Sequence, residues 1–107
     1  MPVKKKIITF PSAYLASRKM AALERNKIDD FISEGNVKLH FDLANVKSIS
    51  ESYSDEIFGV LVLKYGAEKV LNSIQLDNTK DYILASVAKV INRREIERNA
   101  TIENNID

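Results

Sequence analysis

The hydrophobic pattern changes its period at Gly35 and Asn36, and this change constrains the fold more than any other feature of the sequence. Before it, apolar residues recur at the spacing of one helix face, at Met20, Leu23, Ile28, Phe31 and Ile32. After it, residues 37–43 alternate strictly between apolar and polar, which is typical of a strand with one polar face. A helix therefore ends at a glycine and passes directly into a strand.

The remaining segments continue this alternation. Residues 3–10 predict a strand that stops at Pro11, and Ser17 is the predicted cap of the first helix. We then expect a helix from about Tyr53 to Tyr65, a helical turn over residues 67–71, a strand around Ile74 and Leu76, and a last helix capped by Asn78 or Thr79. The order β-α-β-α-β-α predicts an α/β fold with a mainly parallel sheet. Because two strands alternate cleanly, we expect the helices to pack on one face only.

The length of 107 residues, 45% of them hydrophobic, fits one domain with a small core. We expect this domain to occupy residues 1–98 and a flexible tail to follow over residues 99–107. Three arginines, Arg93, Arg94 and Arg98, are then expected near the end of the last helix, where cations suit the helix dipole.

The composition excludes several classes of function. Lys and Arg number 16 against 15 Asp and Glu, so the net charge of +1 gives no bulk attraction to nucleic acid or to an anionic membrane. The basic residues are dispersed and are expected to be solvated. Cysteine is absent, which excludes disulfides, thiolate metal sites and cysteine catalysis. With no signal peptide and no apolar run of about 20 residues, we expect a soluble, cytoplasmic protein.

Few residues could carry catalytic chemistry. His40 is the only histidine and has no partner ligand in the sequence for a metal site. Asp42, Asp55 and Glu56 could meet at a strand end as a magnesium site. We favour the simpler interpretation, in which Ser52 and Asp55 form a capping box and the carboxylates suit the positive end of a helix dipole. We therefore expect no catalytic residue, no metal, no cofactor and no enzymatic activity.

Hydroxyl groups cluster where the second helix begins. Ser50, Ser52 and Ser54 lie at or just after the expected carboxyl end of the central strand, an edge where open α/β sheets bind ligands and partners. No base near them in the sequence would activate a serine as a nucleophile. All three are candidate phosphorylation sites.

The second helix is more apolar than a helix with one core-facing stripe needs to be. Its apolar residues are Ile57, Phe58, Val60, Leu61, Val62, Leu63 and Tyr65. Two interpretations stay open: the helix is wedged between two neighbours, or its outer side is a docking face for another chain.

One stretch of the chain resembles a known family. Residues 38–61 contain Phe41-Asp42, the Asn45-Val46 turn and the run from Ile49 to Phe58, and they resemble the bacterial STAS-like domain of unknown function. Residues 15–18 and 90–94 also resemble the family pattern. This family is similar in turn to the STAS domains of anti-sigma factor antagonists. The resemblance extends from about Ile7 to Arg94.

The resemblance implies an alternation of strands and helices like that of STAS domains and a role in protein recognition, with an ATP-binding histidine-kinase-like protein as the implied partner class. The antagonists carry an Asp-Ser pair in which the serine is the phosphorylated switch. Aligning residues 59–61 with them places Ser54 at the aspartate and Asp55 at the switch serine. Asp55 would then act as a fixed negative charge, which favours constitutive binding over phosphorylation-controlled switching.

These observations lead to a regulatory, non-enzymatic interaction module that docks a protein partner through residues 50–61. The expected contact residues are Ser50, Ser52, Ser54, Asp55, Glu56, Phe58 and Val62, with Phe58 or Val62 as apolar anchors. The alternative is a regulator that binds a small molecule or nucleotide at the same loop and helix start. A homodimer through the second helix is also left open.

Overall fold

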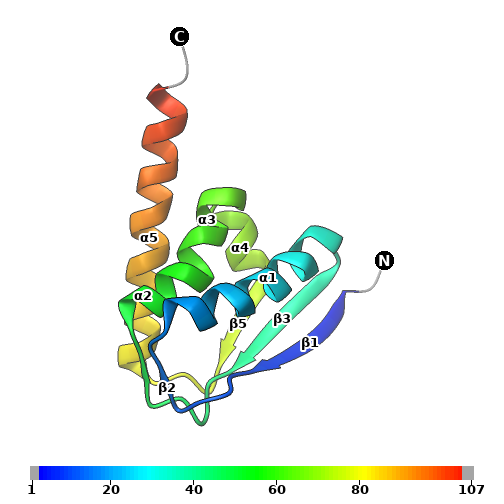
Figure 1. Ribbon diagram of the computed structural model, residues 1–107. Helices are drawn as coiled ribbons and strands as arrows, with labels where there is room; N and C mark the ends of the chain where they lie inside the picture. The colour runs from blue at the N-terminus through cyan, green and yellow to red at the C-terminus, as the bar shows by residue number, and fades with distance from the viewer. Residues whose placement is uncertain (1–2, 105–107) are drawn as a thin grey trace.

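The main sheet of the protein has three parallel strands. The computed structural model describes residues 3–104, and its main strands are β1 (Lys4–Thr9), β3 (Val37–Asp42) and β5 (Ile74–Asp77), in the order β1-β3-β5. A second parallel pair, β2 (Tyr14–Leu15) with β4 (Ser48–Ile49), lies beyond the carboxyl ends of β1 and β3 (Figure 1). The mainly parallel sheet is confirmed. The short pair was not predicted, because two residues are too few to show an alternating pattern.

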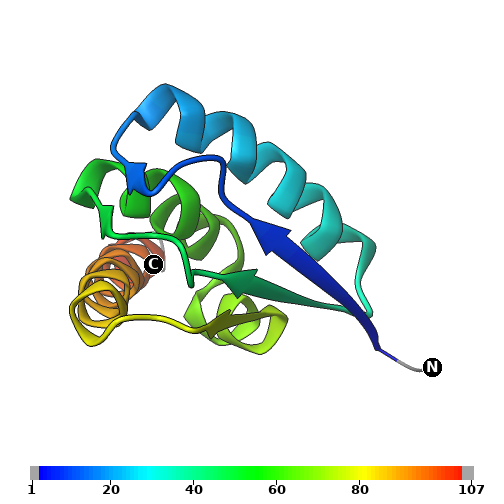
Figure 2. The same ribbon diagram turned by 90° about the horizontal axis from the view of Figure 1, so that it is seen from below.

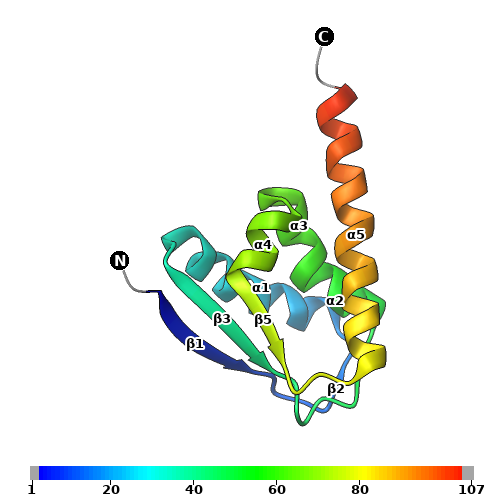
Figure 3. The same cartoon turned by 180° about the vertical axis from the view of Figure 1, so that it is seen from behind.

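The helices lie on one face of this sheet, as predicted. They are α1 (Arg18–Glu34), a continuous helical stretch over residues 51–65, α4 (Ala67–Ser73) and α5 (Asp81–Asn104). The stretch 51–65, here called the central helix, consists of α2 (Glu51–Ser54), the π-helical turn η1 (Asp55–Gly59) and α3 (Val60–Tyr65). Figure 3 shows the three strands in front of α1.

The first helix begins and ends where its sequence signals predict. The Ser17 hydroxyl accepts a hydrogen bond from the Met20 N–H at 3.2 Å, so Ser17 is the N-cap. At the other end Gly35 and Asn36 have φ angles of 76° and 56°. This left-handed backbone stops the helix and turns the chain into β3.

The central helix is wedged between α1 and α5, so the first of the two open interpretations is confirmed (Figure 1). Four of its apolar residues are at most 1% exposed, namely Ile57, Phe58, Leu61 and Val62. Phe58 packs edge-on against Phe41 of β3, with 5.6 Å between the ring centroids. Burying a side chain of this size stabilises the fold by about 1.5–3 kcal/mol, so the central helix is the middle of the core.

The last helix differs from its sequence prediction at both ends. It begins at Asp81, after both predicted caps; Asn78 instead adopts a left-handed turn with φ 56°. It continues to Asn104, whereas a tail was predicted from Asn99 onward. No glycine or proline lies between Asp81 and Asn104 to stop it. Residues 105–107 of the predicted tail lie outside the described residues. No helix within residues 3–104 is both long enough and apolar enough to cross a membrane.

Candidate functional site

The central helix is capped by Ser50 and not by Ser52. The Ser50 hydroxyl accepts a hydrogen bond from the Tyr53 N–H at 3.0 Å and donates one to the Ala16 carbonyl at 3.1 Å. The helix therefore begins two residues earlier than predicted. The proposed capping box of Ser52 and Asp55 is wrong, because Asp55 lies a full turn inside the helix and faces α5.

A π-helical turn follows the first turn of the central helix. The Val60 N–H donates to the Asp55 carbonyl, five residues earlier, which widens the helix over residues 55–59. Gly59 lies inside this turn, at a position where there is no room for a side chain. A Cβ on Gly59 would lie 2.4 Å from Asp55 Oδ1 and 3.0 Å from Arg94 Cγ. Because position 59 has no side chain, the carboxylate of Asp55 and the side chain of Arg94 on α5 can both approach the backbone of Gly59 closely.

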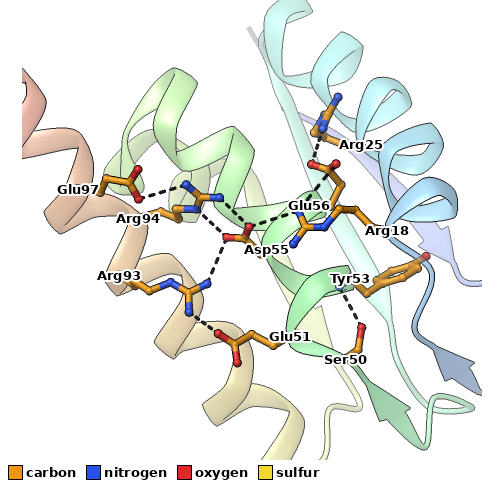
Figure 4. A network of polar contacts seen from close by, with 10 residues as sticks. All are labelled: Arg18, Arg25, Ser50, Glu51, Tyr53, Asp55, Glu56, Arg93, Arg94 and Glu97. Carbon is orange, nitrogen blue, oxygen red and sulfur yellow. Dashed lines mark hydrogen bonds and ion pairs between the residues drawn. The ribbon is translucent and has the colours of Figure 1, made fainter.

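Asp55 is a buried carboxylate held by arginine. Its side chain is 6% exposed, and Arg94 on α5 donates to it from two nitrogens, Nε to Oδ1 and Nη2 to Oδ2, both at 2.7 Å (Figure 4). This two-pronged arrangement is the strong form of an arginine–carboxylate contact. The hydrogen bonds from Arg94 hold the pKa of Asp55 below its usual value, although burial opposes the shift. Asp55 is therefore ionised, with its charge compensated inside the fold.

A ring of partly exposed polar side chains surrounds this pair (Figure 4). Arg18 of α1 lies 3.5 Å from Asp55 Oδ2, and Arg93 of α5 lies 3.4 Å from Oδ1. Arg93 also contacts Glu51, and Arg25 of α1 donates to Glu56 at 2.7 Å. The side chains of Arg18, Glu51 and Arg93 are 50%, 61% and 46% exposed. We call Arg18, Glu51, Ser52, Glu56 and Arg93 the polar rim.

The three serines have different environments. Ser50 uses its hydroxyl as both acceptor and donor in the helix cap. Ser54 is fully buried, and its hydroxyl has no hydrogen-bond partner among the described residues. Ser52 alone is exposed at the start of the central helix. Of the three candidate phosphorylation sites, only Ser52 offers a free hydroxyl to a second protein.

Tyr53 points away from the polar rim, toward α1 and the segment that follows β1. Its ring packs edge-on against Phe10, with 6.2 Å between centroids, and its hydroxyl is buried with no partner within residues 3–104. This burial raises the pKa of the Tyr53 phenol to about 12. The phenol is therefore protonated at neutral pH and holds the helix start in the core.

The two predicted apolar anchors lie in the core. Phe58 is 1% exposed and Val62 is 0% exposed. A partner that meets the folded domain cannot contact either side chain. The prediction was wrong because the central helix is covered on two sides, by α1 and by α5, and a sequence does not show which helices lie on either side.

The three acidic residues of the considered magnesium site do not form one site. Asp42 accepts hydrogen bonds from the Ala44 N–H at 3.0 Å and from the Asn78 side chain at 3.1 Å. Asp55 and Glu56 are instead engaged by arginines. Residues 3–104 contain no group of three or more metal-binding side chains. His40 lies on the uncovered face of the sheet, where its Nδ1 is 2.9 Å from Asp77 Oδ2.

The arginines of the site were missed at the sequence level. Arg18, Arg93 and Arg94 were interpreted as solvated, and the last two were placed near a helix end, but α5 extends ten residues beyond Arg94. One signal could have found them. Asp55 lies on the same helix face as Phe58 and Val62, three and seven residues later, so it had to be buried, and a buried carboxylate needs a cation.

Comparison with known proteins gives one match. A family model described as a STAS-like domain of unknown function (DUF4325) matches residues 25–84. This range is narrower than the resemblance seen in the sequence, and it includes Glu51, Asp55 and Glu56 but neither Arg18 nor Arg94. Searches of curated proteins and of solved structures gave no significant match.

Proposed function

This chain belongs to the family of STAS-like domains of unknown function, and on that premise we propose that it is a non-enzymatic regulatory module that docks a protein partner through its polar rim. The observation that carries the proposal is the meeting of α1, α2 and α5 at one surface. The side chains of Arg18, Glu51 and Arg93, each about half exposed, surround a buried carboxylate whose charge is compensated. Such a ring offers fixed donors and acceptors, which favour specific recognition of a polar surface.

The non-enzymatic part of the proposal rests on how the acidic groups are used. Asp55 accepts two hydrogen bonds from Arg94 and lies close to Arg18 and Arg93, so it is a poor proton acceptor. Ser50 is bound within the helix cap, and Ser54 is buried. These groups stabilise the surface and leave no activated nucleophile at the rim.

We further propose that partner binding is constitutive with respect to position 55. The residue aligned with the switch serine of the antagonists is Asp55, which is 4% exposed and paired with Arg94. A partner therefore cannot contact the Asp55 carboxylate directly. Modification, where it occurs, would fall on Ser52, whose phosphate would add negative charge beside Glu51 and so change the charge that the rim presents to a partner.

The experiment compares native co-purification by the wild-type chain and by Arg93→Glu. We expect a partner, identified by mass spectrometry, that is retained by the wild-type chain and lost with Arg93→Glu. The ATP-binding histidine-kinase-like class is the expected one. The control is Lys69→Glu on α4, an exposed lysine whose ammonium group lies over the Tyr65 ring. Equal retention by both variants would place the docking surface elsewhere.

Binding of a small molecule or nucleotide at the helix start is the alternative function. Within the described residues, the Tyr53 N–H is already bonded to the Ser50 side chain and the Ser54 N–H to the Ser50 carbonyl. These bonds use donors that an anion would need. A thermal-shift screen with nucleotides separates the two functions, because a ligand that binds the folded state raises its melting temperature.

A further inference from the structure

β1 is the border strand of the main sheet, and one side of its backbone is free. It pairs with β3 alone among the described strands. The Lys4 N–H donates to the Asn36 carbonyl at 2.8 Å, so the backbone groups of Lys4 face β3. Peptide groups of successive residues in a strand point to opposite sides, so Lys6 and Ile8 also face β3.

The outward groups therefore belong to the residues between them, Lys5, Ile7 and Thr9. Each presents one N–H and one C=O away from the sheet, and none of these groups has a hydrogen-bond partner within residues 3–104. This row of alternating donors and acceptors is a template for one more strand. Figure 2 shows β1 at the border of the sheet, with α1 alongside it.

A hollow runs along this border between β1 and α1. One part, of about 490 Å³, has the apolar side chains Ile8, Ile28 and Phe31 in its wall, together with charged side chains of β1 and α1 at its sides. A second part, of about 620 Å³, shares Lys6 and Phe31 with the first and continues along β1 to Lys4. An added strand would direct every second side chain into this hollow, where apolar side chains would be buried.

The other side chains of an added strand would lie on the face of the sheet that no helix covers. There Lys5 of β1 lies in register beside Lys38 of β3. The Lys38 ammonium group donates to the Asn72 carbonyl of α4 at 3.1 Å, so the cation next to an added strand is that of Lys5. Ile7 on the same face is 62% exposed. An acidic side chain in an added strand would pair with Lys5 across the strands, a favourable arrangement in sheets.

We propose that the outer edge of β1 accepts an extended segment of a partner protein as an added parallel or antiparallel strand, in which apolar residues alternate with acidic ones. A second copy of this chain is a poor occupant. Three consecutive lysines, Lys4 to Lys6, lie on the edge, and lysine at a border strand is a feature that prevents edge-to-edge pairing of like chains. This surface is separate from the polar rim.

The test uses a short capped peptide of alternating glutamate and valine, with a peptide of alternating lysine and valine as its counterpart. Calorimetry measures affinity, and amide hydrogen exchange followed by NMR measures which backbone groups become protected. We expect the glutamate peptide to bind about tenfold more tightly than the lysine peptide, and the amides of Lys5, Ile7 and Thr9 to exchange more slowly once it binds. Protection confined to other residues, or equal binding of both peptides, overturns the proposal.

Two variants test the geometry. Ile7→Pro removes one outward N–H and leaves the bonds to β3 in place, as proline is tolerated at strand borders with the missing donor toward solvent. It should weaken the glutamate peptide about tenfold. Lys5→Glu should weaken the glutamate peptide and strengthen the lysine peptide, each about fivefold, and it remains informative if Ile7→Pro does not fold.

Self-association provides the remaining outcome. Light scattering on the wild-type chain without peptide should show that two copies do not associate through this edge. A dimer in which the amides of Lys5, Ile7 and Thr9 are already protected would assign the edge to a second copy and overturn the proposed occupant.

Discussion

The surroundings of Asp55 and the outer edge of β1 differ in whether their polar groups have hydrogen-bond partners. At the Asp55 cluster the carboxylate is buried and accepts two hydrogen bonds from Arg94, with two further arginines nearby. At the border strand β1, backbone donors and acceptors stay unpaired within the described residues, and most side chains are exposed. The first region is a closed network that stabilises one structure, while the second can accept new hydrogen bonds. Substitutions should therefore change stability strongly in the first region and weakly in the second.

The largest effect is expected for Asp55→Ala. It leaves Arg94, whose side chain is 22% exposed, without its main partner, and breaking a buried ion pair from one side destabilises a fold by about 3 kcal/mol. Urea unfolding followed by circular dichroism measures the change. Glu97→Ala, which removes an exposed partner of the same arginine, is the matched control and should cost less than about 1 kcal/mol.

The same contact predicts a pH dependence. Arg94 lowers the pKa of folded Asp55, so the unfolded chain binds a proton at this site more readily than the folded one. The stabilisation is then complete above the unfolded pKa of about 3.9 and is lost as the pH falls through the folded value. We expect the difference in unfolding free energy between wild type and Asp55→Asn to shrink in acid. A constant difference from neutral pH to the acid limit would contradict this assignment.

Gly59→Ala should destabilise the domain by about 2 kcal/mol, because the added Cβ would lie 2.4 Å from Asp55 Oδ1. Most of this cost should disappear when the carboxylate is removed. In an Asp55→Ala background, Arg94 Cγ at 3.0 Å still has to move slightly, and the better helix propensity of alanine offsets this, so Gly59→Ala should cost less than about 0.5 kcal/mol. A double-mutant cycle measured by urea unfolding gives the coupling. If the two effects simply add, the close approach of the carboxylate is not the reason for the glycine.

Ser50→Ala should cost about 1 kcal/mol, because it removes the cap of the central helix. Ser52→Ala is the natural control, since this hydroxyl is exposed and should change stability by less than about 0.5 kcal/mol. Thermal unfolding of the two variants, measured side by side, shows which of the two serines caps the central helix. A larger loss with Ser52→Ala would restore the sequence-based cap.

The smallest effect is expected at the border strand. Ile7→Thr replaces a side chain that is 62% exposed with another β-branched residue, so the unfolding free energy should change by about 0.5 kcal/mol or less. Urea unfolding measures it beside Asp55→Ala. A loss as large as that of Asp55→Ala would show that the outer face of β1 is part of the stable core, and the contrast between the two regions would disappear.

Local sequence signals were sufficient for much of the fold. The cap at Ser17, the left-handed stop at Gly35 and the alternation in residues 37–43 are each determined by a few neighbouring residues, and each was found where predicted. The extended α5 was underestimated because residues 99–104 carry no apolar stripe. A helix can nevertheless continue past the core where no glycine or proline stops it.

The candidate site was only partly predictable. Residues 50–61 were correctly identified as the segment where a polar loop meets an apolar helix. The side chains that make it a site come from elsewhere, since Arg18 lies on α1 and Arg93 and Arg94 lie on α5. No local pattern assigns an arginine to a carboxylate 39 residues away.

By itself the sequence determined the order of the main strands and helices, the single polar face of β3 and the need to bury the central helix. Hydrophobic periodicity and helix-stopping residues act over a few neighbouring positions, so they can be recognised locally. Only the tertiary structure decided which sides of that helix are covered, that Asp55 is paired with Arg94 across the domain, and that the outer edge of β1 is unpaired within residues 3–104. These outcomes depend on contacts between segments far apart in the chain, and their energies arise only when packing brings the segments together.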